Sequence, residues 1–188
     1  MLIAFFALWF VQLGLAPAYD TVNNIIQDVP ADLRDSVLLV ARYDELPEEP
    51  GAAPDRQAYI AQVNRNAARG NEVLREVVRG IYPHPVEFVS LADIPAYKAR
   101  GYAYFVDMVL MPKQMTVAKK EAMVPAWIKY GTANKMFANR YTQFQFYFYI
   151  RDLRTDDAYV TTRLRGHAEA YDGIRKFLGQ VLKDLDTH

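Results

Sequence analysis

The chain has 188 residues, of which 52% are hydrophobic and 13% aromatic, enough apolar material for one packed domain and against intrinsic disorder. Lys plus Arg number 22 and Asp plus Glu number 22, so no net charge is present to attract nucleic acid or an anionic membrane surface. We therefore expect no nucleic acid among its partners.

The first 18 residues, MLIAFFALWFVQLGLAPA, contain no charged side chain. The apolar run from Leu2 to Leu15 is shorter than the about 20 residues that a membrane-spanning helix needs, and Ala16 to Ala18 supply the small residues that a signal peptidase recognises. This pattern predicts a signal peptide, 1–18, and a periplasmic or secreted protein. Two alternatives stay open, in which residues 2–18 anchor the protein in the inner membrane or form a buried first strand or helix. An uncleaved leader is the membrane contact that we expect, if there is one.

Cysteine is absent from the sequence. An exported chain of this kind has no disulfide, so its stability has to come from core packing, as is common in a bacterial envelope space. The absence also excludes zinc–thiolate sites, a cysteine nucleophile and a lipid on cysteine.

The segment after the leader contains the first predicted elements. Asp20 or Thr21 is a suitable N-cap for a short helix that ends at Gln27. The run SVLLVARY, residues 36–43, is nearly continuous in apolar side chains, which predicts a strand that is covered on both faces. Residues 46–54 contain three prolines and a glycine and are predicted to be a loop.

A long amphipathic helix follows, with Asp55 as its predicted N-cap. Its apolar residues recur at spacings of three and four: Ile60, Val63, Ala67, Leu74, Val77, Val78 and Ile81. The stripe is interrupted at Gly70, and a glycine in a helix often marks close packing against another backbone. Charged side chains occupy most of the remaining faces, as in a solvated surface.

A short strand at 86–90, a turn of helix at 93–98 and a strand at 102–111 come next. Strand 36–43, the long helix and strand 86–90 form a β-α-β unit, so these two strands are predicted to be parallel, with a right-handed crossover. Asp107 is the one formal charge in the run YAYFVDMVLM, and we expect it at an edge, at a bulge or on the wetter face.

Residues 112–141 carry scattered Met, Trp and Phe without a clear period, which is typical of a functional loop or of a flap over the domain. Residues 142–164 alternate aromatic and polar side chains around a charged middle, which predicts a β-hairpin, and a last helix is expected at 168–185. Residues 19–188 are thus predicted to form a single globular α/β domain. Its α+β sandwich would have a mixed β-sheet, a β-α-β unit, a late β-hairpin and two main helices packed mostly on one face.

The sequence shows no constellation of catalytic residues. Asp152, Asp156 and Asp157 crowd the hairpin turn among arginines, but they lack the Gly and Glu of a calcium loop, so turn chemistry explains them better. His84 lies between two prolines with no Ser or Asp beside it in the sequence. A hydrolase that uses His84 with an acid brought close by folding is the weakest functional hypothesis. We expect no cofactor and no metal.

Aromatic side chains are the more informative set. The candidate binding residues lie in the hairpin and in the segment before it: Tyr147, Tyr149, Tyr159, Arg163, Trp127 and Tyr130. The three hairpin tyrosines are expected to share one face, with the arginine beside them. Cross-strand aromatic pairs stabilise a sheet by roughly 0.2–1 kcal/mol each, so structure alone accounts for them, and the alternative is an exposed platform for a partner.

The order of these segments resembles a superfamily of bacterial envelope domains. It includes the amino-terminal domain of the Tol translocation propeller protein, the curli-secretion lipoprotein and the lipoprotein activator of a penicillin-binding protein. The matching stretches are SVLLVARYD, NEVLREVVRGIYPHPVEFV, GYAYFVDMVL, FYFYIRDLRTDDAYVTTRLRG and YDGIRKFLGQVLKDL. RDLRTDDAYV is the most specific of them. The resemblance covers residues 36–186 and implies a non-enzymatic envelope module that binds a protein partner or associates with copies of itself.

The leading hypothesis is therefore an exported, non-enzymatic interaction domain that acts as an accessory or assembly factor in the periplasm. The alternative is a carrier of a small ligand or lipid, in which residues 112–141 close over an apolar pocket.

Overall fold

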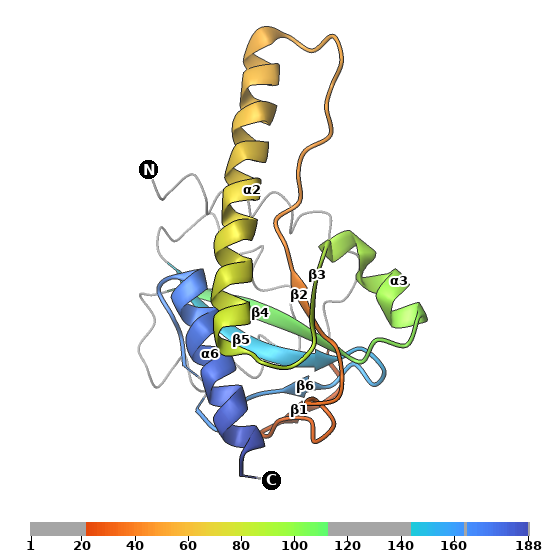
Figure 1. Ribbon diagram of the computed structural model, residues 1–188, viewed down its shortest axis with the longest axis vertical. Coiled ribbons are helices and arrows are strands. Elements are labelled where there is room, and N and C mark those ends of the chain that lie inside the picture. The colour runs from red at the N-terminus through yellow and green to blue at the C-terminus, as the bar shows by residue number, and fades with distance from the viewer. Residues whose placement is uncertain (1–21, 113–143, 164, 188) are drawn as a thin grey trace.

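The computed structural model of the chain describes residues 22–112, 144–163 and 165–187 (Figure 1). The elements in chain order are β1 (Ile25–Ile26), β2 (Leu38–Ala41), α2 (Pro54–Ile81), β3 (Val86–Val89), the 3-10 helix η1 (Leu91–Asp93), α3 (Ile94–Ala99), β4 (Tyr104–Pro112), β5 (Phe144–Asp152), β6 (Ala158–Tyr159) and α6 (Ala170–Leu185). Six strands form one mixed sheet in the order β1-β6-β5-β4-β2-β3. The predicted α/β fold is confirmed.

The β-α-β unit is present as predicted. Strand β2 pairs in parallel with β3 on one side and with β4 on the other. From β2 the chain passes through α2 to β3 on one side. From β3 it passes through α3 to β4 on the other side of β2, so the strand order reverses at β2. The carboxyl ends of β2 and β4 therefore form a switch point of the kind at which open α/β sheets usually bind their ligands.

The late hairpin is also confirmed, although its second strand is short. Strand β5 pairs antiparallel with the whole of β4, and then with β6 through two residue pairs, one of which joins Ile150 and Tyr159. Strand β6 continues into a parallel pairing with β1. The predicted helix ending at Gln27 is wrong, because the backbone of this segment pairs with β6 instead: the Val160 amide donates to the Ile26 carbonyl at 2.9 Å. Sheet pairing at an open edge thus outweighs a weak local helix propensity.

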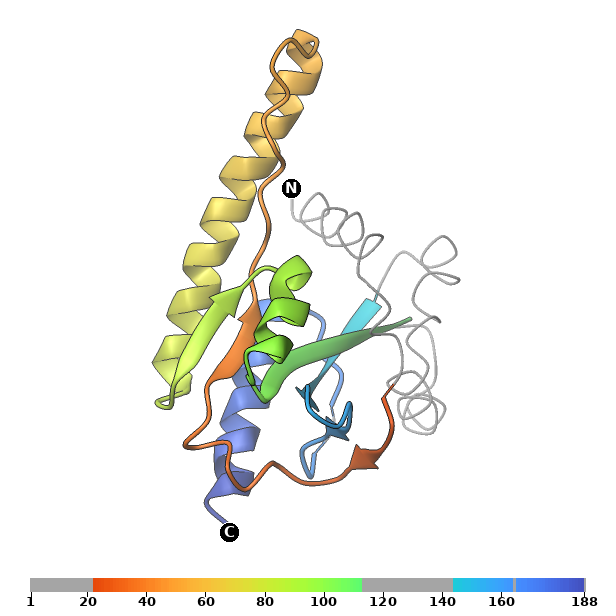
Figure 2. The same cartoon turned by 90° about the vertical axis from the view of Figure 1, so that its right-hand side faces the viewer.

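Two helices cover one face of the sheet, as predicted. α6 and the second half of α2 pack over the side chains of β2, β4 and β5, and the rings of Phe148 and Phe177 stack at a centroid distance of 6.0 Å. The core residues of this face include Leu38, Val40, Leu74, Val78, Tyr104, Val106, Phe146, Ile150, Ile174, Leu178 and Val181. α3 lies on the opposite face of the sheet (Figure 2). A smaller cluster near it contains Leu39, Val89, Ile94, Phe105 and Leu153.

α2 is much longer than the sheet that it covers. Its 28 residues correspond to about 42 Å at 1.5 Å per residue, and both views show its first half standing clear of the sheet beside an extended segment (Figures 1 and 2). The helix begins at Pro54, and its N-cap is Ala53 rather than the predicted Asp55. Proline is favoured there because its missing N–H needs no partner in the first turn.

Candidate functional site

The projecting part of the molecule consists of the extended residues 42–53 and of residues 54–70 of α2, and we call it the arm. Neither of the two core clusters contains a residue between Arg42 and Asn71. The arm is therefore built from its own contacts rather than from those of the domain core.

A ladder of carboxamide side chains ties the helix of the arm to the extended segment. Asn71 accepts from the Tyr43 amide and donates to the Tyr43 carbonyl, both at 2.8 Å. One heptad earlier, Asn64 makes the same two bonds with Leu46, at 2.8 and 3.0 Å. One heptad earlier again, Gln57 donates to the Ala52 carbonyl at 2.9 Å. These side chains satisfy backbone groups that have no strand beside them.

Between the carboxamides, the helix packs small and apolar side chains against the same segment. Ile60, Val63 and Ala67 are buried, and Gly70 lies where the arm meets the domain. A Cβ on Gly70 would come within 3.0 Å of the Tyr43 ring and of the Tyr171 hydroxyl. The predicted close packing at this glycine is present, but against two tyrosine side chains rather than against a backbone.

The outer surface of the arm carries charges without partners. Arg65 and Arg69 on the helix, and Glu45 and Glu48 on the segment, form no ion pair within the described residues. Nearer the tip, Arg56 pairs with Glu49 at 2.5 Å, and this hydrogen bond raises the pKa of the arginine and lowers that of the carboxyl group.

A small pocket lies at the base of the arm, at the carboxyl end of β2 and beside residues 105–108 of β4, and we call it the base pocket. Its volume is about 70 Å³. The lining residues are mostly apolar: Val40, Ala41, Tyr43, Leu74, Leu91, Phe105, Val106, Asp107, Met108, Phe148, Ala170, Tyr171 and Ile174. Burial raises the pKa of the Tyr171 hydroxyl, which donates to the Gly70 carbonyl at 3.3 Å. The base pocket has room for part of one side chain, whereas drug-sized ligands occupy about 300–1,000 Å³.

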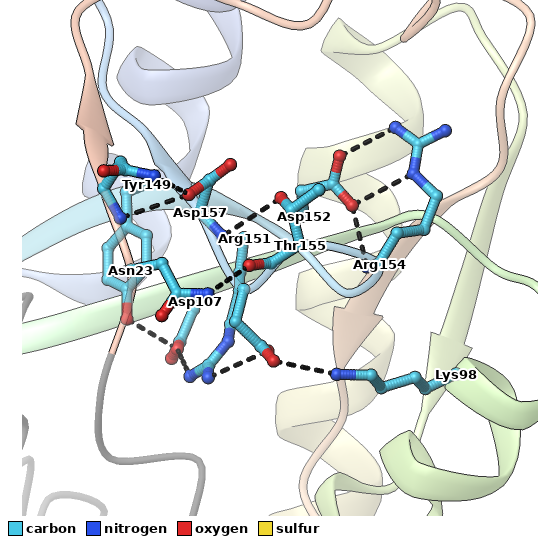
Figure 3. Close-up of polar contacts among 11 residues, drawn as sticks. Asn23, Lys98, Asp107, Tyr149, Arg151, Asp152, Arg154, Thr155 and Asp157 are labelled. Atoms are coloured by element: carbon cyan, nitrogen blue, oxygen red, sulfur yellow. Dashed lines mark hydrogen bonds and ion pairs between the residues drawn. The ribbon is translucent and has the colours of Figure 1, made fainter.

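A charged network lies on the sheet face opposite α2 and α6 (Figure 3). Its centre is Arg151, which is only 3% exposed and lies 3.2 Å from a carboxylate oxygen of Asp156 and 4.0 Å from one of Asp107. The Tyr149 hydroxyl donates to Asp107 at 2.6 Å, and Lys98 donates to Asp156 at 2.9 Å. Burial would raise the pKa of Asp156, but the hydrogen bonds from Lys98 and Arg151 outweigh it and lower the pKa.

The acidic residues after β5 form a hydrogen-bonded turn, as the sequence indicates. The Asp156 amide donates to the Asp152 carbonyl at 2.8 Å, and Asp156 adopts a left-handed φ of 57°, which aspartate tolerates better than most residues. Arg154 donates to both carboxylate oxygens of Asp152, at 3.0 and 2.7 Å. Within the described ranges, no group of three or more acids and histidines is placed to hold a metal ion.

The structure separates the predicted binding residues. Tyr147 and Tyr149 are 6% and 3% exposed, which agrees with the structural explanation and not with the alternative of an exposed platform. Tyr159 pairs with Ile150 and therefore lies on the helix-covered face, away from the other two tyrosines. Arg163 is exposed just beyond β6, while Trp127 and Tyr130 lie outside the described residues.

The hydrolase hypothesis gains no support from the surroundings of His84. Among the described residues, its side chain has a single interaction, an edge-on contact of its ring with Tyr82 at 5.3 Å. Asp107 lies on β4 one residue beyond the last pair with β2 and is partly exposed, in agreement with the expectation of an edge or a wetter face.

The arm was missed in the sequence, although a signal for it is present. Gln57, Asn64 and Asn71 are spaced by seven residues and fall on the apolar stripe of the helix. A buried carboxamide needs hydrogen-bond partners, so amides on an otherwise apolar stripe indicate that this face of the helix packs against polar groups such as backbone. No helix in the described parts of the chain is both long and apolar enough to span a membrane.

Neither a known protein family, nor a curated protein, nor a solved structure matches this chain.

Proposed function

We propose that the protein is a non-enzymatic docking domain that binds a protein partner through the arm and acts as an accessory or assembly factor. The observation that carries this proposal is the arm itself, which extends beyond the domain core and holds its inner backbone groups with the carboxamide ladder. A surface that is already ordered before binding loses little conformational entropy when a partner binds.

The outer surface of the arm has the composition of an interface. Tyrosine and arginine are the residue types most enriched at binding hot spots, and the arm exposes Tyr59, Arg65 and Arg69. Charges that no described residue pairs lie on both of its sides, and they favour recognition of a partner in a defined orientation, since electrostatic complementarity selects partners and speeds their encounter.

The proposed compartment is the periplasm or the extracellular space, reached through a signal peptide at 1–18, with an inner-membrane anchor at 2–18 as the alternative. The cysteine-free composition supports it. Mass spectrometry of the purified protein from an envelope fraction tests the proposal: we expect Tyr19 as the first residue, and an intact Met1 in a cytoplasmic fraction contradicts it.

The described residues give the carrier alternative no support: the base pocket, at about 70 Å³, is several times smaller than a lipid-sized cavity, and residues 113–141, which would have to close over it, lie outside the described residues.

Photo-crosslinking in a cell extract tests the docking proposal. A photoreactive amino acid at Gln62, on the exposed side of the arm, should give a discrete adduct, whereas the same amino acid at Lys183, on the exposed side of α6, should give none. Excess purified protein should compete the adduct away, and so should a variant with Arg75→Glu. A variant with Arg65→Glu and Arg69→Glu should not compete. Equal adducts from Gln62 and Lys183 would overturn the proposal.

A further inference from the structure

The side of α2 opposite its buried residues carries charges in two blocks. Arg65 and Arg69 form a basic block on the arm, and Glu72 and Glu76 form an acidic block just beyond it. At about 100° per residue these four positions fall within an arc of about 60°, and all four are exposed. We call them the charged row. Figure 2 shows α2 along the left side of the molecule, with no described element beyond it.

Within one chain, the order of these charges is unfavourable. Each block places two like charges four residues apart, and like charges at this spacing destabilise a helix, whereas opposite charges stabilise it. No residue of the charged row forms an ion pair with another described residue. By contrast, Arg175 and Lys176 on α6 both pair with Asp172 of the same helix, at 2.8 and 2.6 Å. The charges of the row are therefore available for a contact with another molecule.

A second copy of the chain supplies the complementary charges. When two α2 helices lie antiparallel, a two-fold axis midway between Arg69 and Glu72 places Arg69 opposite Glu72 of the second copy. Arg65 and Glu76 lie four residues further from the axis on either side, so they also face each other. Because one operation satisfies all four pairs, the arrangement closes as a dimer. We propose that α2 binds a second copy of this chain in this way, an inference that rests on the arm being the docking surface and names its partner.

The neighbouring side chains allow the two helices to come close. Ala61 lies eight residues before Arg69, and Gly80 lies eight residues after Glu72, so Ala61 and Gly80 of the two copies also face each other. A Cβ on Gly80 would have open space around it. Small residues at such positions permit helix axes to approach to about 8 Å.

The two domains do not obstruct this arrangement. Within each copy, the sheet lies against the second half of α2, on the side away from the charged row (Figures 1 and 2). Because the helices are antiparallel, the two sheets lie at opposite ends of the dimer and on its opposite outer sides. The arm of each copy then lies over the second half of the other copy's α2. The dimer thus uses the part of the helix that neither core cluster of its own chain includes.

The contact should be weak and sensitive to salt, because two helices bury less surface than a standard interface and exposed ion pairs are screened by ions. Sedimentation velocity in a low-salt buffer, over a series of concentrations, should show the average mass rise from one chain toward two. Sodium chloride at about 0.5 M should return it to one chain.

Charge-reversal variants give the sharp test. Arg65→Glu with Arg69→Glu makes the whole row acidic, and Glu72→Arg with Glu76→Arg makes it basic. Each double variant alone should stay monomeric, because like charges face each other across the axis, and an equimolar mixture should associate. A variant with all four charges reversed should associate like the wild type. Arg75→Glu, on the same helix but about 90° from the centre of the row, is the matched control and should also associate. Thermal melting checks that each variant folds.

A wild-type protein that stays monomeric at every concentration in low salt overturns the inference, and so does a mixture of the two double variants that fails to associate. A photoreactive amino acid at Gln62 in the purified protein should give an adduct of twice the chain mass without any extract, because Gln62 faces Arg79 of the second copy. If it gives none, while the extract gives an adduct of another mass, the docking proposal stands and the second copy is overturned. Absence of any adduct from Gln62 in both experiments overturns both proposals.

Discussion

Arg151 shows the role of the face of β5 that carries Tyr147 and Tyr149. Its guanidinium is buried on the face opposite α2 and α6, between the carboxylates of Asp107 and Asp156, and Tyr149 joins the same network. The face is therefore a structural, charge-paired layer. A buried cation requires its partners, since the cost of desolvation is recovered only through close hydrogen bonds.

We expect Arg151→Met to lower the free energy of unfolding by about 2–4 kcal/mol, because it removes the buried cation between Asp107 and Asp156 and leaves Asp156 paired with Lys98 alone. Arg163→Met, at an exposed position, is the matched control and should change it by less than about 0.5 kcal/mol. Urea titration measures both, and similar values for the two variants would contradict the structural role of Arg151.

His167 makes the stability depend on pH. Its burial lowers the pKa of the imidazole, and the nearby Lys176 and Arg165 lower it further, against the opposing effect of Asp172. The folded state thus favours the neutral ring. Its contribution is fully present above the unfolded pKa of about 6.5 and is lost as the pH falls through the lower folded value.

We therefore expect the melting temperature of the wild type to fall as the pH is lowered below about 6.5. His167→Gln should flatten this part of the profile, because glutamine does not titrate. A profile of the same slope in both proteins would show that other groups cause the loss.

The residue scale also shows what a sequence pattern leaves undetermined. Alternation within β5 correctly places Phe146 and Phe148 on one face and Tyr147 and Tyr149 on the other. Alternation cannot place Tyr159, because its face depends on the number of residues in the turn, and the register pairs it with Ile150. Burial of the face that carries Tyr147 and Tyr149 depends on segments distant in the sequence, so a local pattern cannot predict it.

At the scale of elements, Gly70 is where the arm is fixed to the domain. We expect Gly70→Ala to destabilise the protein by about 1–2 kcal/mol, since the new methyl group would press on Tyr43 and Tyr171. Gly80→Ala, in the same helix but with open space around its Cβ, should stabilise it by about 0.5–1 kcal/mol. Opposite signs in thermal melting support the packing, and equal gains in both variants would refute it.

The carboxamide ladder should protect the backbone amides of the extended segment from hydrogen exchange. We expect Asn71→Leu to expose the Tyr43 amide to hydrogen exchange and to cost about 1–3 kcal/mol, because two buried backbone groups lose their partners. Gln57→Leu, which removes one exposed bond, should have little effect. Unchanged exchange at Tyr43 in the Asn71 variant would show that the ladder does not hold the segment.

The long helix itself was predictable, because its apolar stripe has a clear period. Its projection was not, since the stripe continues into the arm through Ile60 and Val63, whose buried neighbours are a loop rather than the sheet. Hydrophobic periodicity reports that a face is covered and not what covers it.

At the scale of the whole molecule, the arm and the domain should be separable. We expect a chain in which a short glycine linker replaces residues 45–68 to unfold in one cooperative transition with an unchanged near-ultraviolet circular dichroism spectrum, because neither core cluster includes an arm residue. A broad transition with loss of that spectrum would mean that the arm is part of the core.

The fold class followed from the β-α-β pattern, since two parallel strands joined by a helix allow few topologies. The first strand, β1, could not be predicted from the sequence pattern. It consists of two residues, Ile25 and Ile26, whose partners lie more than 130 positions later in the chain. A pairing across such a distance leaves no local signature.

That pairing has a consequence for biosynthesis. As the polypeptide leaves the ribosome, the segment around Ile25 has no partner strand until Ala158 and Tyr159, more than 130 positions later, have been translated. This edge of the sheet can therefore close only after the four strands between β1 and β6 in the sequence have been made, and during that time the nascent segment stays open to a holding chaperone.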